Sequence, residues 1–149
     1  MNLQVKKIKD VKSPERAHPT DSGIDFFVPD GVDLDLRPRE SITFPLGVSV
    51  RIPKWYDLVF HNRSSIASQN GVILWACVVD NGYEWEILLN LINTSGKSFK
   101  IKWWNKIVQA VMREVGLWDV EVVKEFKEEK KEKNTKKTRG EGGFGSTGN

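Results

Sequence analysis

The sequence predicts an all-β fold, a sandwich or a barrel, followed by a flexible C-terminal arm. Its apolar residues fall into short runs rich in β-branched and aromatic side chains, and turn signals separate these runs. No window of about 12 residues keeps a helical period, apart from the charged stretch near 124–133. At 149 residues the chain has the length of one domain with a sizeable core.

The predicted strands are the apolar runs between these turns. The turn signals are Pro53, Asn70-Gly71, Asn81-Gly82 and Ser95-Gly96. The strands are predicted over residues 26–28, 42–52, 55–60, 72–79, 87–92, 99–101 and 107–112. We therefore expect a β core over residues 1–126, a charged flexible linker over 127–138 and a glycine-rich arm over 139–149.

Composition argues against several classes of protein. Residues 1–123 hold as many basic as acidic residues, so the net charge of +3 arises after this point, and a nucleic-acid surface on the folded body is not indicated. Cys77 is the only cysteine, and His18 and His61 are the only histidines, which argues against a disulfide or a zinc site. With no apolar segment long enough to span a membrane and no signal-peptide pattern, we expect a soluble, cytoplasmic protein.

The last eleven residues have the composition of a phosphate-binding flap. Glycines recur from Gly140 to Gly148, and such a backbone can wrap closely around a ligand. Arg139 offers a planar fork of donors to phosphate, hydroxyls follow in the same segment, and Phe144 offers a flat face to a base. The alternative is a disordered polar tail, as many Gly/Ser-rich termini are.

Two polar clusters precede or follow strands in the first half of the body. Residues 20–25 place Asp21 and Asp25 on either side of a glycine turn, although this is also an ordinary Asp/Ser/Gly turn. Residues 62–68 offer Arg63 with two hydroxyls. Ser64 or Ser65 could cap a short helix whose N–H groups face a phosphate, or the same cap could serve no ligand.

Two further clusters lie in the second half. An apolar strand ends at Val78-Val79 in a predicted hairpin turn that presents Asp80 and Tyr83, and an ionised carboxylate there could deprotonate a water. Asn81-Gly82 alone would be an ordinary hairpin turn. Gln109 is a lone amide in an apolar strand, where a solvent-facing position is the usual reason for such a residue.

In this order, the clusters resemble the five motifs of the trimeric deoxyuridine triphosphate nucleotidohydrolases, the dUTPases. Residues 21–25 resemble motif one, 63–67 motif two, 71–83 motif three, 106–109 motif four and 139–148 motif five. The resemblance implies a jelly-roll-like subunit and a homotrimer with active sites shared between subunits. It also implies Mg²⁺-assisted hydrolysis of dUTP to dUMP and pyrophosphate, which limits uracil incorporation into DNA and supplies dUMP for dTMP synthesis.

The resemblance also implies roles for particular residues. Asp80 would be the base that activates the attacking water at the α-phosphate, and Asp25 would support the metal and phosphate side. Phe144 would cover the uracil, and Mg²⁺ would be held mainly by the substrate phosphates, with no direct protein ligand. The implied substrate-binding residues are Arg63, Ser64, Ser65, Val79, Tyr83, Gln109, Arg139, Phe144, Gly145, Ser146 and Thr147.

Some positions depart from the family pattern. Residues Leu74 to Cys77 replace a more polar, glycine-containing segment at the uracil pocket, Trp85 stands where glycine is common, and His61-Asn62 stands where proline usually precedes the arginine. A related deoxycytidine triphosphate deaminase, or a bifunctional form, would need a glutamate where this chain has Asn90. A nucleotide-sensing binding protein on the same fold is the third possibility.

Overall fold

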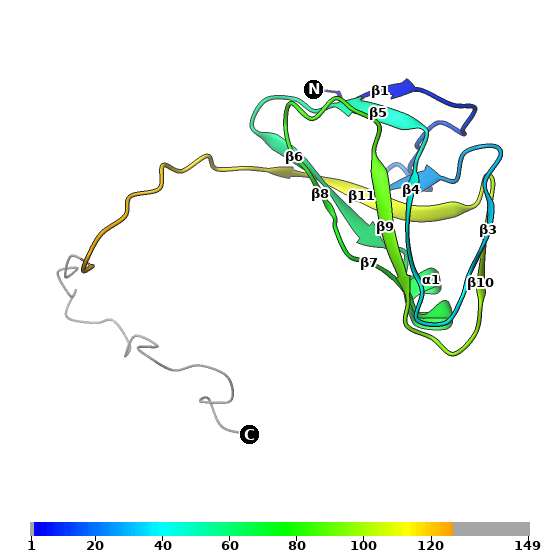
Figure 1. Ribbon diagram of the computed structural model, residues 1–149. Coiled ribbons are helices and arrows are strands. Elements are labelled where there is room, and N and C mark those ends of the chain that lie inside the picture. Colours follow the sequence, from blue (N-terminus) through cyan, green and yellow to red (C-terminus); the bar gives the residue numbers. More distant parts are fainter. Residues whose placement is uncertain (1, 127–149) are drawn as a thin grey trace. The chain divides into compact units, whose positions relative to one another are not determined.

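The computed structural model describes residues 2–126, and the predicted linker over 127–138 and arm over 139–149 lie outside this range. Contacts divide the chain into a compact unit, Met1–Leu117, and a second unit that begins at Trp118. The helix and all strands of the described residues belong to the first unit (Figure 1). The three-part division of the chain stays a prediction.

A four-stranded antiparallel sheet carries most of the candidate site. Its order is β2-β11-β6-β8, so the long strand β11 lies between two others and pairs with both. The register opposes Gln109 of β11 to Asp25 of β2 on one side and to His61 of β6 on the other. The strands are β2 (Ile24–Phe27), β6 (Tyr56–Asn62), β8 (Val78–Val79) and β11 (Lys106–Glu114).

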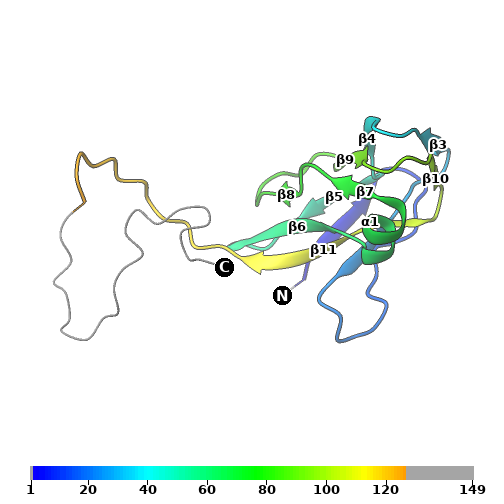
Figure 2. The ribbon, with the colours of Figure 1, turned by 90° about the horizontal axis from the view of Figure 1, so that it is seen from below.

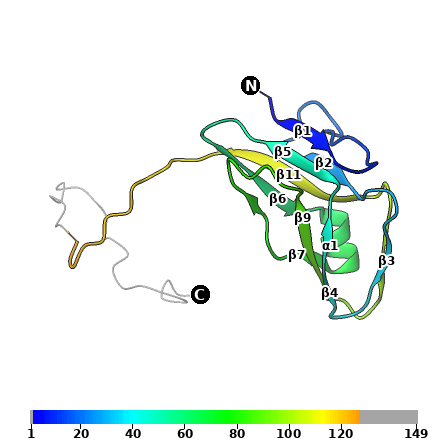
Figure 3. The same ribbon diagram turned by 45° about the horizontal axis from the view of Figure 1, so that its top comes forward.

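The remaining strands form smaller antiparallel sheets. The three-stranded sheet has the order β4-β9-β7, and two pairs, β1-β5 and β10-β3, complete the set (Figures 1 and 3). These strands are β1 (Gln4–Lys7), β3 (Asp33–Leu36), β4 (Ser41–Pro45), β5 (Val48–Arg51), β7 (Val72–Leu74), β9 (Leu88–Asn93) and β10 (Phe99–Lys102). The predicted all-β, jelly-roll-like class is confirmed.

The core consists of side chains from every sheet. Phe26 packs edge-on against Phe60, with ring centroids 5.0 Å apart. Alternate residues of β9, Leu89 and Leu91, are buried, as expected of a strand with one face on the core. Leu58, Ile101 and many other apolar residues complete one continuous cluster. Burial of these side chains stabilises the strands, and the ends of these strands carry the polar clusters of the candidate site.

One helix, α1 (Ser64–Asn70), follows β6 directly and is visible beside the sheet edge in Figure 2. The sequence predicted a short helix here, but with Ser64 or Ser65 as its cap. Instead Arg63 occupies the N-cap position, without a side-chain capping bond. Gly71 ends the helix in the left-handed region at φ 65°, where its N–H donates to the carbonyl of Ala67.

Two of the predicted strands are each divided in the structure. The run 42–52 becomes β4 and β5, because Gly47 adopts φ 70° and donates its N–H to Glu86 Oε1 at 3.0 Å. The run 72–79 becomes β7 and β8, which pair with different sheets. The predicted hairpin after Val79 is also wrong. Tyr83 N–H donates to the Asp80 carbonyl in a turn, but β8 pairs with β6.

Two strands had no clear signal in the sequence. β1 and β3 have the sequences QVKK and DLDL, and their charged residues have low strand propensity. β3 alternates aspartate with leucine, and its Leu36 is buried in the core. Its aspartates oppose the lysines of β10: Asp35 lies opposite Lys100, and Asp33 lies opposite Lys102. Burial of Leu36, with a small contribution from these exposed charge pairs, thus compensates for poor propensity.

Within residues 2–126, three residues other than glycine adopt left-handed backbone conformations: Arg39 at φ 63°, Trp55 at φ 70° and Trp104 at φ 62°. A side chain in this region brings Cβ close to the backbone, which costs about 1 kcal/mol or more. All three are exposed. Because Arg39 is exposed, its side chain makes no core contacts that a glycine would lose.

Arg39→Gly should raise the free energy of unfolding by about 0.5–1 kcal/mol, because glycine adopts φ > 0 without strain. Arg37→Gly is the matched control, since Arg37 is exposed in the same turn and is not among the residues with positive φ. It should lower stability by a similar amount. Urea denaturation of both variants measures the difference, and equal destabilisation by the two substitutions would contradict the strain argument.

Candidate active site

An almost buried carboxylate, Asp25 on β2, is bound by two cations from different segments. Arg63 Nε lies 3.2 Å from Oδ1, and Lys106 Nζ lies 2.7 Å from Oδ2. Arg63 Nη1 also donates to the Lys106 carbonyl at 3.2 Å. Because each oxygen of Asp25 has its own partner, the carboxylate joins β2, the β6–α1 junction and β11 at one point.

The same cluster extends toward the N-terminal loop. Glu15 forms an isolated bridge with Asp25, exchanging backbone hydrogen bonds at 2.8 and 3.2 Å. Its carboxylate binds Lys12 at 2.7 Å and lies 3.9 Å from Lys106. Lys12 and Lys106 both lie over the ring of Phe27, at 4.6 and 5.8 Å from its centroid. Most of the positive charge near Asp25 is therefore already paired.

A polar pocket of about 370 Å³ opens beside this cluster. It brings together residues that are predicted from three separate segments of the sequence. Its lining residues are Asp21, Ser22, Gly23, Asp25, Arg63, Ser64, Ser65 and Gln109. Arginine, hydroxyl and amide groups supply hydrogen-bond donors, so the chemistry of this pocket suits a phosphate chain.

The position of Gln109 depends on its neighbours. Its Nε2 donates to the backbone carbonyl of Asn62 at 3.1 Å. Gly23 lies so close that an added Cβ would be 2.3 Å from Gln109 Oε1. Gly23 thus leaves room for the Gln109 side chain, and an added methyl group would displace it.

Asp80 and Tyr83 lie at a different place in the chain. Asp80 is exposed and lines a pocket of about 300 Å³ with Trp55, Asn81 and Leu117 among its neighbours. Asn81 anchors the turn, because its Nδ2 donates to the carbonyls of Ile52 and Pro53 at 2.7 and 2.9 Å. No predicted residue of the Arg63 pocket lines this second pocket within the described range.

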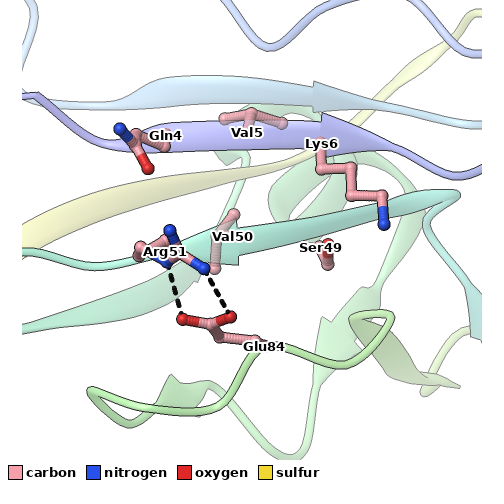
Figure 4. Close-up of a pocket in the computed structure, with 7 residues that line it drawn as sticks. All are labelled: Gln4, Val5, Lys6, Ser49, Val50, Arg51 and Glu84. Carbon is pink, nitrogen blue, oxygen red and sulfur yellow. Dashed lines mark hydrogen bonds and ion pairs between the residues drawn. The ribbon is translucent and has the colours of Figure 1, made fainter.

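Tyr83 is held on several sides. Its hydroxyl donates to the Glu86 carbonyl at 3.1 Å, and its ring meets Trp85 edge-on at 5.6 Å. Glu84 forms a two-pronged ion pair with Arg51 of β5, at 2.7 and 3.0 Å (Figure 4). The hydrogen bonds from Arg51 lower the pKa of Glu84, and the same bonds raise the pKa of Arg51. The turn that carries Tyr83 is therefore tied to β5.

The pocket in Figure 4 is also about 370 Å³ and lies between β1, β5 and this ion pair. None of the described residues predicted for substrate binding lines it. A second ion pair lies on the sheet: Arg113 Nε donates to Asp57 Oδ1 at 3.2 Å. The hydrogen bonds to Asp57 raise the pKa of Arg113. The Asp57–Arg113 pair joins opposed residues of β6 and β11, whereas the Arg51–Glu84 pair joins β5 to a turn, and none of these four residues lines the Arg63 pocket.

The donor set limits how a metal could bind. Over residues 2–126 the structure brings together no group of three or more His, Cys, Asp or Glu side chains suited to a metal ion. Asp25 is occupied by two cations, and Asp21 Oδ2 accepts the N–H of His18 at 2.9 Å. Mg²⁺ readily keeps waters and substrate phosphates as ligands, so these residues fit only a metal held mostly by substrate.

Several residues around the site were not among the sequence predictions. Lys106 and Gly23 lie next to predicted residues within segments 106–109 and 21–25, but the motif pattern gives them no role. In the sequence, Asn62 is only a departure from the family pattern. Their contacts depend on strand register and on side-chain direction, neither of which is visible in the sequence. Arg139, Phe144, Gly145, Ser146 and Thr147 lie outside the described residues.

The structure also places the remaining features. In the part of the chain that the structure describes, no helix is long and apolar enough to cross a membrane. Asn90, on β9, is half-buried, and its backbone carbonyl accepts the N–H of Trp75 at 3.1 Å. Val79, which directly precedes Asp80, pairs with Leu58 of β6. The fold and pocket thus define a β-sheet protein with a polar, phosphate-compatible site at its strand ends.

Comparisons with known proteins agree with this class. The dUTPase family model matches residues 9–148. The chain is 34% identical to the deoxyuridine 5'-triphosphate nucleotidohydrolase of Clostridium tetani, over 98% of this chain and 96% of the relative. It is 36% identical to the same enzyme of a Hydrogenobaculum species, over 99% of both chains. The chain belongs to the dUTPase family.

Solved structures agree as well. The dUTPase of Staphylococcus bacteriophage 80alpha, in a structure with dUPNHPP, superposes with a TM-score of 0.84 and 26% identity. The match covers 99% of this chain and 98% of that chain. A variant dUTPase from phage phi11 of S. aureus, described with a structural Mg(II) ion, has a TM-score of 0.78 at 22% identity, over 86% of this chain and 100% of that chain. This second likeness shows the fold alone.

Asp25→Asn should lower the free energy of unfolding by about 2–3 kcal/mol, because it leaves Arg63 and Lys106 without their shared carboxylate. Asp35→Asn is the matched control. Its ion pair with Lys100 is 4.0 Å long, with both side chains more than half exposed, so its loss should cost less than about 0.5 kcal/mol. Chemical denaturation measures both, and equal effects would contradict the anchoring role of Asp25.

Gly23→Ala should displace the Gln109 side chain while leaving the fold intact, since the flexible amide can rotate away from the new methyl group. We expect turnover to fall about 10- to 100-fold, the scale of a misplaced contact at a reacting centre. Gly96→Ala is the control, because an added Cβ there meets nothing within 4 Å. Turnover and melting temperature separate the two effects. Full activity of Gly23→Ala would show that Gln109 needs no fixed position.

Proposed function

We propose that this chain is a dUTP diphosphatase, which hydrolyses dUTP to dUMP and pyrophosphate. The observation that carries the proposal is the Arg63 pocket, where Asp25, Ser64, Ser65 and Gln109 also meet. The family membership and the similarity to named dUTPases over nearly the whole chain support the same substrate. The activity limits uracil incorporation into DNA and supplies dUMP for dTMP synthesis.

In this proposal the pocket binds the phosphate chain. Asp25 holds Arg63 by its Nε, and the Lys106 carbonyl engages Nη1. Arginine has five N–H donors, so the rest of the guanidinium stays available for phosphate oxygens. Ser64 and Ser65 add hydroxyl donors, and Gln109 binds a phosphate or the attacking water. Arg139, Ser146 and Thr147 of the arm would complete the grip on the γ-phosphate, with Phe144 and Gly145 at the base.

Asp80 is the proposed base. It accepts a proton from a water that attacks the α-phosphorus, the bond from this phosphorus to the bridging oxygen breaks, and pyrophosphate leaves. Tyr83 and Val79 line the sugar side. Mg²⁺ would be held mainly by the phosphates and would neutralise part of their charge. These residue roles rest on position in the family motifs, together with the exposure of Asp80.

The site requires more than one subunit in this proposal. Asp80 lines a different pocket from Arg63 within a single chain, and a homotrimer with shared sites would bring the two together. The segment after Leu117 supports association. Trp118, Val120 and Val122 are exposed and alternate with acidic residues, a strand-like pattern that another copy of the chain could pair with. A cytoplasmic location, without membrane or nucleic-acid partners, completes the proposal.

The alternatives have less support. A deaminase needs a carboxylate to move protons on the base, and the neutral amide of Asn90 cannot do so. A binding protein without activity would have no need for Asp80 on a turn anchored by Asn81. Comparing pyrophosphate release from dUTP, dCTP, dTTP and UTP separates these functions.

Asp80→Asn should reduce dUTP turnover at least ~10²-fold, the scale of a lost general base, and Gln109→Ala should also reduce it. If the site is shared, refolding the two inactive variants together should restore activity, because about a quarter of randomly assembled sites receive an intact residue from each subunit. Steady-state pyrophosphate release from the mixture measures this recovery.

The control mixture combines Asp80→Asn with the double variant Asp80→Asn/Gln109→Ala. No assembled site then has an intact Asp80, so activity should not rise above the level of Asp80→Asn alone. Near-wild-type turnover by Asp80→Asn alone would remove this carboxylate from the mechanism. Absence of recovery in the first mixture would place Asp80 and Gln109 in one subunit's site.

A further inference from the structure

The last residue of β6, Asn62, connects three segments at the candidate site. Its side-chain Oδ1 accepts the backbone N–H of Leu74 at 2.7 Å. Its backbone carbonyl accepts Nε2 of Gln109 at 3.1 Å. Arg63 follows it directly and lines the phosphate-compatible pocket together with Gln109. One residue thus contacts the end of β7, the amide of β11 and the turn that carries the arginine.

The Leu74 amide points away from its own sheet. The next amide along the chain, that of Trp75, donates to the Asn90 carbonyl of β9 at 3.1 Å. Successive backbone amides of a strand point to opposite edges, so the Leu74 N–H faces the other edge of β7, where the Asn62 side chain receives it. β7 ends at Leu74. Asn62 therefore holds the point at which the chain leaves the strand.

We infer that Asn62 is a positioning residue for nucleotide binding, which fixes the base-side segment after Leu74 relative to Arg63 and Gln109 on the phosphate side. The inference rests on the proposed function. Asn62 makes its two contacts through different groups. Its side chain binds the Leu74 N–H, whereas its backbone carbonyl binds Gln109. Substitution of the side chain therefore tests the base-side contact while the Gln109 bond keeps its acceptor.

The neutral amide of Asn62 also suits this location. An aspartate would offer the same oxygen to the Leu74 N–H, but it would add a negative charge directly before Arg63. That charge would oppose a triphosphate, since like charges at this distance raise the free energy of the complex. Asn62→Asp should consequently preserve the backbone contact and weaken substrate binding, whereas Asn62→Ala removes the contact without adding a charge.

The test combines amide exchange with kinetics on the full-length protein. In Asn62→Ala, hydrogen exchange at the Leu74 amide should accelerate about 10-fold, with Trp75 unchanged, and the KM for dUTP should rise about 5- to 10-fold, the scale of one lost hydrogen bond. The kcat should change less than about 2-fold, because the residue touches no reacting atom. Asn62→Asp should keep the Leu74 amide protected while raising KM in a salt-dependent manner.

Asn105→Ala is the control, an exposed asparagine at the β10–β11 turn, and it should leave both measurements unchanged. Equal acceleration at Leu74 and Trp75 in Asn62→Ala would overturn the inference, because it would indicate general loosening of β7. An unchanged KM in this variant would also overturn it. If the unmodified protein failed to hydrolyse dUTP, the proposed function would fall, whereas the exchange data would still report on the Leu74 contact.

Discussion

The bonding of Asp25 to Arg63 and Lys106 is the interaction on which the candidate site depends. A carboxylate with only 7% of its residue surface exposed loses most of its hydration, and a cation on each oxygen offsets this loss. Either cation alone would leave one oxygen of Asp25 without a charged partner. Removing the carboxylate would leave two neighbouring cations without a shared counter-charge. The three groups therefore form a unit whose members depend on one another.

This unit controls what the pocket can bind. Asp25 offsets part of the positive charge of Arg63, the cation that lines the pocket among the described residues, so the free pocket offers hydrogen-bond donors more than net positive charge. It also fixes the direction of the guanidinium, which reduces the side-chain entropy that a ligand must remove on binding. Arg63 is held before a ligand arrives. Its fixed orientation therefore contributes more to ligand binding than its net charge does. The central place of β11 in its sheet extends this rigidity to Gln109.

Much of the fold could be predicted from the sequence, because β9 and β11 are mostly apolar, β10 alternates apolar residues with lysines, and clear turns separate these strands. The division of the run 42–52 could not, since it depends on Glu86, a residue distant in the sequence, receiving the Gly47 N–H. The grouping of motif-one, motif-two and motif-four residues followed from resemblance, whereas their contacts follow from strand register. The sequence pattern predicts a hairpin at Asn81-Gly82, but the strand before this turn, β8, pairs with β6.

The positions of the tryptophans have a spectroscopic consequence. All six indoles of the sequence are at least half exposed in the single chain, from 50% at Trp55 to 88% at Trp118, while the core is built from phenylalanine and aliphatic side chains. We therefore expect their emission to respond less to unfolding of the core than the emission of a buried indole would. The intrinsic fluorescence of this protein reports on what covers its surface, so a blue shift on mixing with a ligand or with another subunit marks contact.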